Sequence, residues 1–212
     1  MTEMTEDTQL VPEPAAADGE EGPIGERANR TRNAILEASR TLFLERGYSG
    51  TRINNITDAC GISRAGFYTY FKDKREIFNI LGSTAYHDVV KVVARWDEIS
   101  RPCTVEEVTE WVRGYFEYLD VHGAFVFAAA QSSELEEQFR TDRRRMQMRV
   151  MFMLGVNLRS RQSRPMEAPE ALGLAVMAML DRSWLDGRMQ DLPIGDRDLV
   201  KTLAEIIMAI IG

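Results

Sequence analysis

The stretch that decides the fold is GISRAGFYTYFKDK, which runs from Gly61 to Lys74. It predicts a short helix that is capped by Ser63 and ends near Tyr70. At about 100° per residue, Phe67 and Phe71 point to the same side of this helix. We therefore expect these two rings to be buried, which leaves the other aromatic residues of the stretch to be explained.

The opposite side of the predicted helix carries small residues. Ala65 and Thr69 lie there, with Gly66, Tyr68 and Tyr70 along its margins. Small side chains allow a backbone to approach base edges, and the major groove of B-DNA admits one α-helix. Tyrosine hydroxyls at the margins are well placed for phosphates. The pattern predicts a helix that enters the major groove; the alternative is that the tyrosines only cover the domain surface.

Basic and polar residues at neighbouring helix ends favour the same interpretation. Arg64 lies at the N-terminus of the short helix, whose positive end also favours a phosphate. Thr51 is expected to cap the preceding helix, so that Thr51 and Arg52 reach the DNA backbone, and Lys74 would do so from the start of the next helix.

The charge of the chain is unevenly distributed. Its net charge is −7, but residues 1–29 hold eight acidic groups and one basic group. Residues 30–80 hold nine basic and five acidic groups. Salt screens fields beyond roughly 8–10 Å, so a locally basic segment can bind phosphates within an acidic chain.

Composition excludes several other classes. The two cysteines, Cys60 and Cys103, have no metal or disulfide spacing, which predicts reduced thiols in a cytoplasm. The histidines His87 and His122 have no companions at metal-ligand spacing, and there is no phosphate-binding glycine loop or nucleophile motif. No signal peptide and no apolar run long enough for a bilayer occur. The sequence therefore predicts no enzyme, cofactor, metal site or membrane span.

Hydrophobic periodicity predicts an all-α protein. Residues 1–28 are acidic and poor in large apolar side chains, so we expect a disordered tail. A DNA-binding domain is predicted for residues 29–75 and a second helical domain for residues 76–212. The expected helices are Thr31–Arg46 ended by Gly47, Thr51–Cys60, Ser63–Tyr70, Asp73–Trp96, Val105–Leu119, Phe125–Ala130, Ser133–Ser160, Pro169–Gly187 and Asp196–Ile211.

The stretch TRNAILEASRTLFLERGYSGTRINNITDACGISRAGFYTYFKDKREIF, residues 31–78, resembles the N-terminal domain of TetR-family transcriptional regulators. The residues that carry the resemblance are Ile35, Ala38, Phe43, Gly47, Tyr48, Thr51, Ile56, Gly61, Ile62, Ser63, Tyr68, Phe71 and Lys74. The family is all-α and dimeric, and its members are usually repressors released by a small molecule. Thr57 and Cys60 depart from the family's usual alanine; we expect the Thr57 hydroxyl to bond a carbonyl one turn back.

The resemblance also implies which residues contact DNA. Arg64, Ala65 and Gly66 are the expected base readers, and the other residues are expected to hold phosphates. The full predicted set is Thr51, Arg52, Ser63, Arg64, Ala65, Gly66, Tyr68, Thr69, Tyr70 and Lys74. Arg27, Arg30 and Arg32 either reach an adjacent minor groove or form a solvated basic segment.

The last two helices predict a homodimer. The segment ALGLAVMAMLDRSWL is apolar almost all round, and the last helix has two apolar stripes. A helix that is apolar on both sides needs cover on both sides. A second copy would supply it through a four-helix interface, and a dimer would place two reading helices about 34–36 Å apart on a palindromic operator.

The middle helices are rich in aromatic residues and methionine, which suit an adaptable apolar cavity. The family resemblance implies such a cavity for a lipophilic small molecule, although each residue alone is as compatible with an ordinary core. The predicted ligand-binding residues are Trp96, Trp111, Tyr115, Phe116, Phe125, Met148, Phe152, Met177 and Trp184.

The sequence thus predicts a ligand-responsive DNA-binding regulator, most simply a repressor. Two alternatives stay open at this point. One is a regulator of the same build without small-molecule control, or an activator. The other is an α-helical lipid carrier or enzyme that kept the N-terminal fold.

Overall fold

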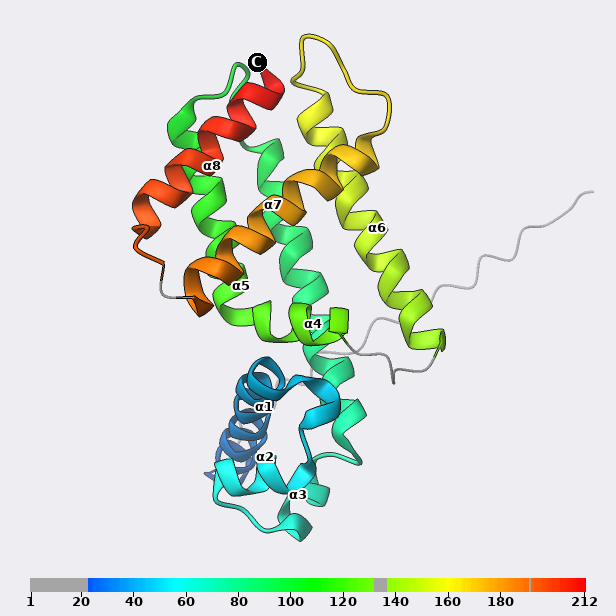
Figure 1. The fold of residues 1–212 in the computed structure, drawn as a ribbon. Coiled ribbons are helices and arrows are strands. Elements are labelled where there is room, and N and C mark those ends of the chain that lie inside the picture. The colour runs from blue at the N-terminus through cyan, green and yellow to red at the C-terminus, as the bar shows by residue number, and fades with distance from the viewer. Residues whose placement is uncertain (1–22, 132–136, 191) are drawn as a thin grey trace, which may run out of the picture.

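The computed structural model describes residues 23–131, 137–190 and 192–212, and over these ranges helices are the only regular secondary structure. The predicted all-α class is therefore confirmed. Figure 1 shows α1, α2 and α3 grouped at one end of α4, with α5 to α8 around the other part. The elements are α1 (Pro23–Gly50), α2 (Ile53–Cys60), α3 (Arg64–Tyr70), α4 (Lys74–Ala94), a 3-10 helix η1 (Arg95–Asp97), α5 (Val105–Gln131), α6 (Glu137–Arg159), α7 (Pro169–Met189) and α8 (Asp196–Ile211).

The first helix is longer than predicted. It begins at Pro23 instead of Thr31, so residues 23–28 are helical and the expectation of disorder for them is wrong. Proline is well tolerated in a first turn, because its missing N–H has no helical acceptor there anyway. Residues 1–22 of the predicted tail lie outside the described residues. Gly47 has a φ of 69° and breaks the regular helix where the sequence placed the stop.

The three N-terminal helices enclose a hydrophobic cluster of their own. Ile35 and Phe43 of α1, Ile56 of α2 and Phe67 of α3 are almost fully buried in it. Aromatic rings fill its centre: Phe43 and Phe78 meet edge to face with their centroids 5.6 Å apart. This cluster fixes the position of the short helix α3.

Helix α4 belongs to both halves of the molecule. Asp73 caps it, since the Asp73 carboxylate accepts a hydrogen bond from the Glu76 amide at 2.8 Å. Its first turns bury Ile77 and Phe78 in the N-terminal cluster, and its later turns bury Val89 in the larger C-terminal cluster. A displacement along α4 is therefore felt in both clusters.

The predicted break between Leu119 and Phe125 does not exist, because α5 continues through Gly123 to Gln131. Gly123 allows α5 and the Trp184 ring of α7 to approach closely, because a Cβ atom at this position would lie 2.5 Å from that ring. The glycine therefore lies inside a continuous helix, where it leaves room for a neighbouring ring.

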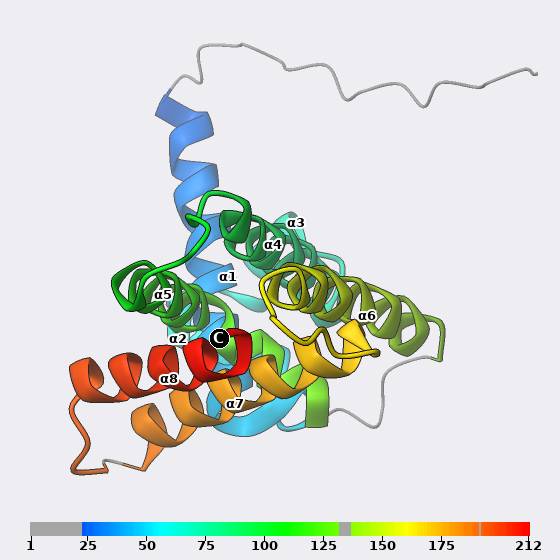
Figure 2. The same cartoon turned by 90° about the horizontal axis from the view of Figure 1, so that it is seen from above.

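The later helices agree more closely with their predicted ranges. Helix α6 begins at Glu137 among the described residues, whereas residues 132–136 of the predicted helix lie outside them. Helix α7 runs two residues beyond the predicted end, to Met189, and α8 spans the predicted range. Seen from above in Figure 2, α7 runs beside α8 and reaches α6 at its other end. In the part of the chain that the structure describes, no helix is both long and apolar enough to cross a membrane.

Helices α6 and α7 touch through their backbones. A Cβ atom at Gly155 of α6 would overlap the carbonyl oxygen of Pro169, and one at Gly173 of α7 would overlap that of Met151. Only a residue without a side chain permits such an approach. The two glycines therefore fix the α6–α7 crossing.

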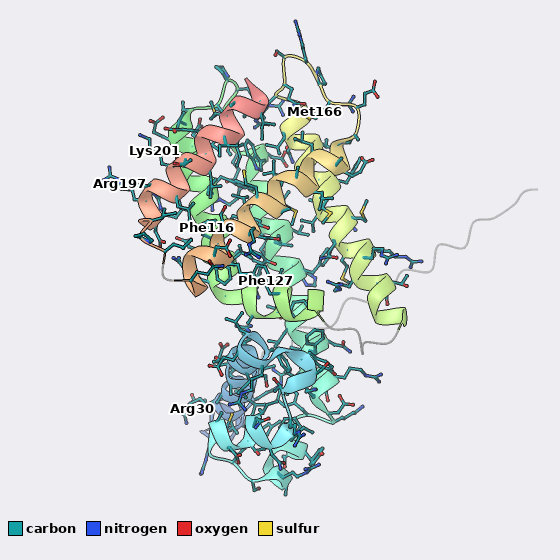
Figure 3. All side chains as sticks on the ribbon, in the orientation of Figure 1. Arg30, Phe116, Phe127, Met166, Arg197 and Lys201 are labelled. Atoms are coloured by element: carbon teal, nitrogen blue, oxygen red, sulfur yellow. The ribbon has the colours of Figure 1, made fainter. Side chains whose placement is uncertain are left out.

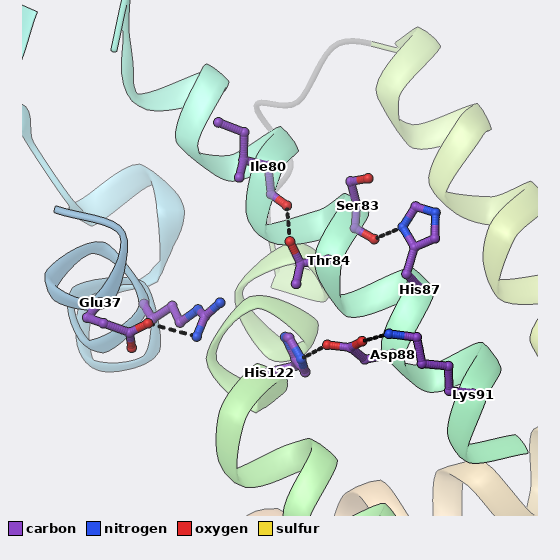
Figure 4. A network of polar contacts seen from close by, with 9 residues as sticks. Glu37, Ile80, Ser83, Thr84, His87, Asp88, Lys91 and His122 are labelled. Atoms are coloured by element: carbon purple, nitrogen blue, oxygen red, sulfur yellow. Dashed lines mark hydrogen bonds and ion pairs between the residues drawn. The ribbon is translucent and has the colours of Figure 1, made fainter. Parts of the chain in front are cut away.

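A polar network ties α4 to α5 next to α1 (Figure 4). His122 Nε2 lies 3.0 Å from a carboxylate oxygen of Asp88, whose other oxygen accepts from Lys91 at 3.0 Å. The Lys91 hydrogen bond holds the pKa of Asp88 below its usual value. Burial lowers the pKa of His122, which favours its neutral form near pH 7. The neutral ring therefore bonds across the two helices without requiring a buried charge.

Candidate nucleic-acid interface and ligand cavity

Helix α3 has one buried and one exposed side, as predicted. The Ser63 hydroxyl accepts a hydrogen bond from the Gly66 amide at 3.0 Å and so caps the helix. Phe67 is fully buried, and Phe71 just beyond the helix is 2% exposed. Gly61 has a φ of 63° and turns the chain sharply between α2 and α3. This helix-turn-helix unit presents the other side of α3 outward.

Small residues make up much of that outward side. Ala65 and Thr69 are exposed and Gly66 is half-buried, while Tyr68 is 46% exposed at the edge. The Thr69 hydroxyl donates to the Ala65 carbonyl at 3.4 Å. Tyr70 is half-buried against the N-terminal cluster. Because most of these side chains are small, the backbone of α3 can come close to the base edges in a DNA groove.

Arg64 is linked to residues of both α2 and α3. Its guanidinium donates to the Asn54 side-chain oxygen at 3.2 Å and to the Tyr68 hydroxyl at 3.2 Å. The guanidinium carbon also lies 5.7 Å from the centre of the Tyr68 ring. Asn54, which lies on α2 two residues after Arg52, was absent from the predicted set. We name Asn54, Arg64 and Tyr68 the reading triad.

Thr51 does not play the predicted role. It is 1% exposed, and its hydroxyl donates to the carbonyls of Leu42 at 3.0 Å and Gly47 at 2.8 Å. The side chain is therefore not available to a phosphate, and Thr51 does not cap α2. The residue before α2 is Arg52, whose amide donates to the Asn55 side chain at 2.9 Å. Thr51 instead joins the end of α1 to α2.

Lys74 is also engaged inside the protein. Its ammonium donates to the carbonyls of Tyr48 and Thr51, the latter at 2.8 Å, and lies 4.0 Å from the centre of the Tyr48 ring. The first turn of α4 is thereby clamped to the connection between α1 and α2. The expectation that Lys74 is a simple phosphate ligand is corrected: it first of all holds the helix-turn-helix unit to α4.

These residues border a concave surface with a volume of about 710 Å³. It lies between the end of α1 and the starts of α2, α3 and α4. Four basic residues and one acidic residue line it. The lining side chains with charge are Arg52, Arg64, Asp73, Lys74 and Arg75. Arg52 is exposed at the start of α2, where its charge faces solvent. A basic hollow beside an exposed narrow helix is suited to a nucleic-acid backbone.

The arginines of α1 divide into two kinds. Arg27 and Arg30 are exposed, and Figure 3 shows Arg30 on the outer side of the N-terminal helices. The guanidinium of Arg32 lies over the Phe71 ring, 5.3 Å from its centre. Arg32 thus packs against the domain. Arg27 and Arg30 are exposed to solvent, and they lie on the helix α1.

The two departures from the resemblance are accommodated locally. The Thr57 hydroxyl donates to the Asn54 carbonyl at 3.0 Å, one turn back, as predicted. The Cys60 thiol lies 3.5 Å from the Ala34 carbonyl, and burial raises the pKa of this thiol.

A second hollow lies in the C-terminal half, between α4, α5, α6 and α7. Its volume is about 340 Å³, and most of its surface is apolar. Of the nine predicted ligand-binding residues, Tyr115, Phe125 and Met177 line it. The hollow therefore shares three lining residues with the predicted set, and the rest of its lining differs.

The other six predicted ligand-binding residues lie elsewhere. Trp96 and Trp111 are core residues with 0% and 1% exposure, and their ring centres are 5.2 Å apart. Met148 and Phe152 are exposed on α6, at 46% and 50%. Two further aromatic residues are buried away from the hollow, Phe116 and Trp184. Periodicity identified the buried positions of Trp96, Trp111, Phe116 and Trp184, but it was wrong for Met148 and Phe152 and could not separate core from cavity wall.

Sequence reasoning missed the polar residues of the hollow. Asp181 of α7 lies there, and the Tyr115 hydroxyl donates to its carboxylate at 2.8 Å. Burial of this carboxyl raises its pKa to about 6. Asp142 and Arg143 of α6 also line the hollow. The only signal in the sequence was an aspartate within the apolar run of α7. Arg182 bonds Asp186 at 2.7 Å.

Comparison with known proteins agrees with this site. Residues 35–81 match the family described as bacterial regulatory proteins, tetR family. The transcriptional repressor BepR of Brucella suis is 36% identical over 73 residues, which are 33% of this chain and 35% of BepR. The regulator AcrR of Shigella flexneri is 37% identical over 54 residues, 26% of this chain and 25% of AcrR. The chain thus matches about a third or less of the length of these two relatives.

The likeness of the whole fold extends further. The TetR family regulator PfmR of Thermus thermophilus has a TM-score of 0.66 at 23% identity, over 82% of this chain and 97% of PfmR. That likeness concerns the fold, while the sequence match concerns the helix-turn-helix unit. Taken with the capped α3, its buried phenylalanines and its exposed small residues, the matches show that residues 35–81 form a helix-turn-helix domain of the tetR family.

Proposed function

We propose that the protein is a homodimeric repressor that binds a palindromic operator and releases it when a small molecule occupies the C-terminal hollow. The observation that carries the proposal is the exposed, small-residue side of α3 beside the reading triad and the basic hollow. Repression is favoured over activation because related helix-turn-helix units belong to proteins named as repressors, such as BepR.

In this proposal α3 lies in the major groove. Arg64 reads a base together with the backbone near Ala65 and Gly66, because an arginine fork matches the acceptor pair of guanine. Asn54 and Tyr68 each accept a hydrogen bond from one of the two terminal nitrogens of the Arg64 guanidinium. The Arg64 side chain is therefore already restricted before binding, and it loses less conformational entropy when DNA binds. Phosphates are bound by a second group of side chains: Arg52, Ser63, Tyr68, Thr69 and Tyr70.

Replacing Arg64 with alanine is expected to weaken operator binding by about 10- to 100-fold, since one bidentate base contact contributes about 1–3 kcal/mol. Fluorescence anisotropy with labelled DNA from upstream of the gene measures this. Lys201→Ala is the matched control, because this cation lies on α8 and is also solvent-exposed (Figure 3). Operator affinity of R64A within twofold of the wild type would contradict the assignment of Arg64.

The dimer is proposed from an apolar surface shared by α7 and α8. Leu174 is 49% exposed and Ile206 is 41% exposed. Between the two helices lies an apolar groove of about 440 Å³, whose lining includes Ala171, Ala175 and Ile210. Within α8 the stripe of Val200, Ile207 and Ile211 faces the chain's own core. The outward apolar side is what a second copy would cover, through a two-fold four-helix contact.

The double variant Leu174→Glu, Ile206→Glu is expected to be monomeric, because each carboxylate would be desolvated at the two-fold contact. Light scattering should give the 24.1 kDa of one chain instead of twice that mass. Val121→Glu, at a 49% exposed position of α5, is the control and should stay dimeric. A dimeric double variant would place the interface elsewhere.

Ligand control requires that the hollow and α3 share a structural element, and Phe125 meets this condition. Its ring lines the hollow and also packs 4.7 Å from the ring of Phe78 in the N-terminal cluster. The ring of Phe78 in turn lies 4.6 Å from that of Tyr48, next to the Lys74 clamp. A ligand that moves Phe125 or α4 would thereby shift the helix-turn-helix unit, and it must bind the DNA-incompetent state better.

A further inference from the structure

The polar groups of the C-terminal hollow distinguish between classes of ligand. Its wall is mostly apolar, and titratable side chains enter it from all four helices. These are Tyr86 of α4, Tyr115 and Tyr118 of α5, Asp142 and Arg143 of α6, and Asp181 of α7. The ligand must satisfy the group among them that is least well stabilised.

Asp181 is that group. Among the described residues, only the Tyr115 hydroxyl donates to its carboxylate, and no lysine or arginine lies within ion-pair distance. The neighbouring Arg182 is exposed and turns toward Asp186 instead. Near neutral pH this half-buried carboxylate is mostly ionised, because its pKa of about 6 is below 7. A partly desolvated charge without an opposite charge is costly, and a ligand cation would relieve that cost.

Aromatic rings surround the same place. The rings of Tyr115 and Tyr118 are 5.7 Å apart, and Tyr86 and Phe125 complete an aromatic wall. Burial raises the pKa of both Tyr115 and Tyr118 above the usual value, so these phenols stay neutral. Neutral aromatic faces attract organic cations, especially quaternary ammonium groups. The wall therefore favours the same charge as Asp181.

The α6 side of the hollow has the opposite character. The Arg143 Nε atom is buried and has no hydrogen-bond partner among the described residues. Burial lowers the pKa of this guanidinium, with Arg144 adding repulsion. Arg143 thus repels a cationic group from its part of α6, although Asp142 of α6 also lines the hollow, while Asp181 and the tyrosine rings attract the cation toward α5 and α7. The hollow imposes an orientation on an elongated ligand.

We propose that the hollow binds an amphipathic organic cation, with its positive group against the Asp181 carboxylate and the tyrosine rings and its apolar body along α4 and Phe125. This assignment rests on the proposed ligand-controlled function and specifies its ligand class. Asp181 is the specificity-determining residue, and Tyr115 positions its carboxylate.

Three small-molecule probes of nearly the same shape test which ligand charge the hollow prefers. They are benzyltrimethylammonium, its neutral carbon analogue neopentylbenzene, and phenylmethanesulfonate, whose head group is anionic. Calorimetric titration of the full chain near pH 7.5 should give the cation at least a tenfold tighter dissociation constant than either analogue, which corresponds to about 1.4 kcal/mol. The quaternary ammonium does not titrate, so weaker binding near pH 5 reports protonation of the protein.

Asp181→Asn keeps an acceptor for the Tyr115 hydroxyl and removes the charge. It should weaken binding of the cation at least about tenfold, leave the neutral analogue within about threefold, and abolish the loss of affinity near pH 5. Asp142→Asn is the matched control, because it removes the other carboxylate of the hollow. This control should retain the preference for the cation.

The outcomes separate the two proposals. Equal binding of the cation and the neutral analogue, a preference for the sulfonate, or unchanged cation binding by D181N would overturn the assigned charge and leave ligand control intact. Tight cation binding with no change in operator affinity would contradict ligand control and support the charge assignment. If none of the three probes binds, both proposals are wrong for this hollow.

Discussion

Replacing Gly173 with alanine is expected to lower the free energy of unfolding by at least about 3 kcal/mol, the upper range for overpacking a dense core. The added Cβ atom would overlap the Met151 carbonyl oxygen, which belongs to the backbone of α6 and cannot rotate away. Helices α6 and α7 would have to separate, and this would open the core around Leu154 and Val176. Denaturant unfolding followed by circular dichroism, at fixed protein concentration, measures the loss.

The same helix offers a matched control. A Cβ atom at Gly187 would lie 3.5 Å from a methyl carbon of Leu199, which is an ordinary contact. Gly187→Ala should therefore be neutral or stabilise by up to about 1 kcal/mol through helix propensity. Gly155→Ala repeats the test from the α6 side, where the overlap is with the Pro169 carbonyl. Equal stability of G173A and G187A would show that α6 and α7 do not touch through their backbones.

Replacing Asp181 with asparagine is expected to stabilise the unliganded protein at neutral and alkaline pH. The folded-state pKa of about 6 exceeds the ordinary value of 3.8. As the pH rises from 4 toward 6, the unfolded chain releases this proton while the folded chain retains it. Stability is thus lost over that window, by about 3 kcal/mol in the limit, since one pKa unit corresponds to about 1.4 kcal/mol.

The pH profile separates this effect from the cost of burying an amide. The free energy of unfolding of the variant minus that of the wild type should rise by about 2 kcal/mol between about pH 4.5 and pH 8. Chemical unfolding at several pH values gives this difference directly. A difference independent of pH would mean that Asp181 titrates normally and is well solvated in the folded protein.

Much of the helix-turn-helix unit follows from local sequence rules. Ser63 and Asp73 are caps, Gly47 and Gly61 adopt positive φ angles, and Phe67 is buried where helical periodicity places it. Each of these features depends on a few adjacent residues, which is why sequence alone predicts it.

Roles that depend on distant partners could not be predicted. Thr51 and Lys74 are polar and lie near helix starts, so they were assigned to DNA, but both bond to backbone carbonyls in α1 or just after it. Conversely, Asn54 was missed because only the folded chain brings it to Arg64. A donor's chemistry can be read from sequence, whereas its acceptor depends on the tertiary structure.

The ligand hollow was least predictable. Burial is visible in periodicity, and Trp96, Trp111 and Phe116 are indeed buried, but a core residue and a cavity wall share the same pattern. The break predicted between Leu119 and Phe125 was also wrong, since Gly123 lies within α5 and receives the Trp184 ring. Shape complementarity between helices decides both cases.

The three tryptophans of the chain, Trp96, Trp111 and Trp184, all lie buried in the C-terminal cluster, and the helix-turn-helix unit contains none. Trp184 stacks on Phe127 with an interplanar angle of 2° and donates its indole N–H to Asp120 at 2.8 Å. Intrinsic emission excited at the indole band therefore originates entirely from the half that holds the hollow. A change of that emission on adding operator DNA would report, without any attached dye, that the proposed binding at the helix-turn-helix unit alters the C-terminal half.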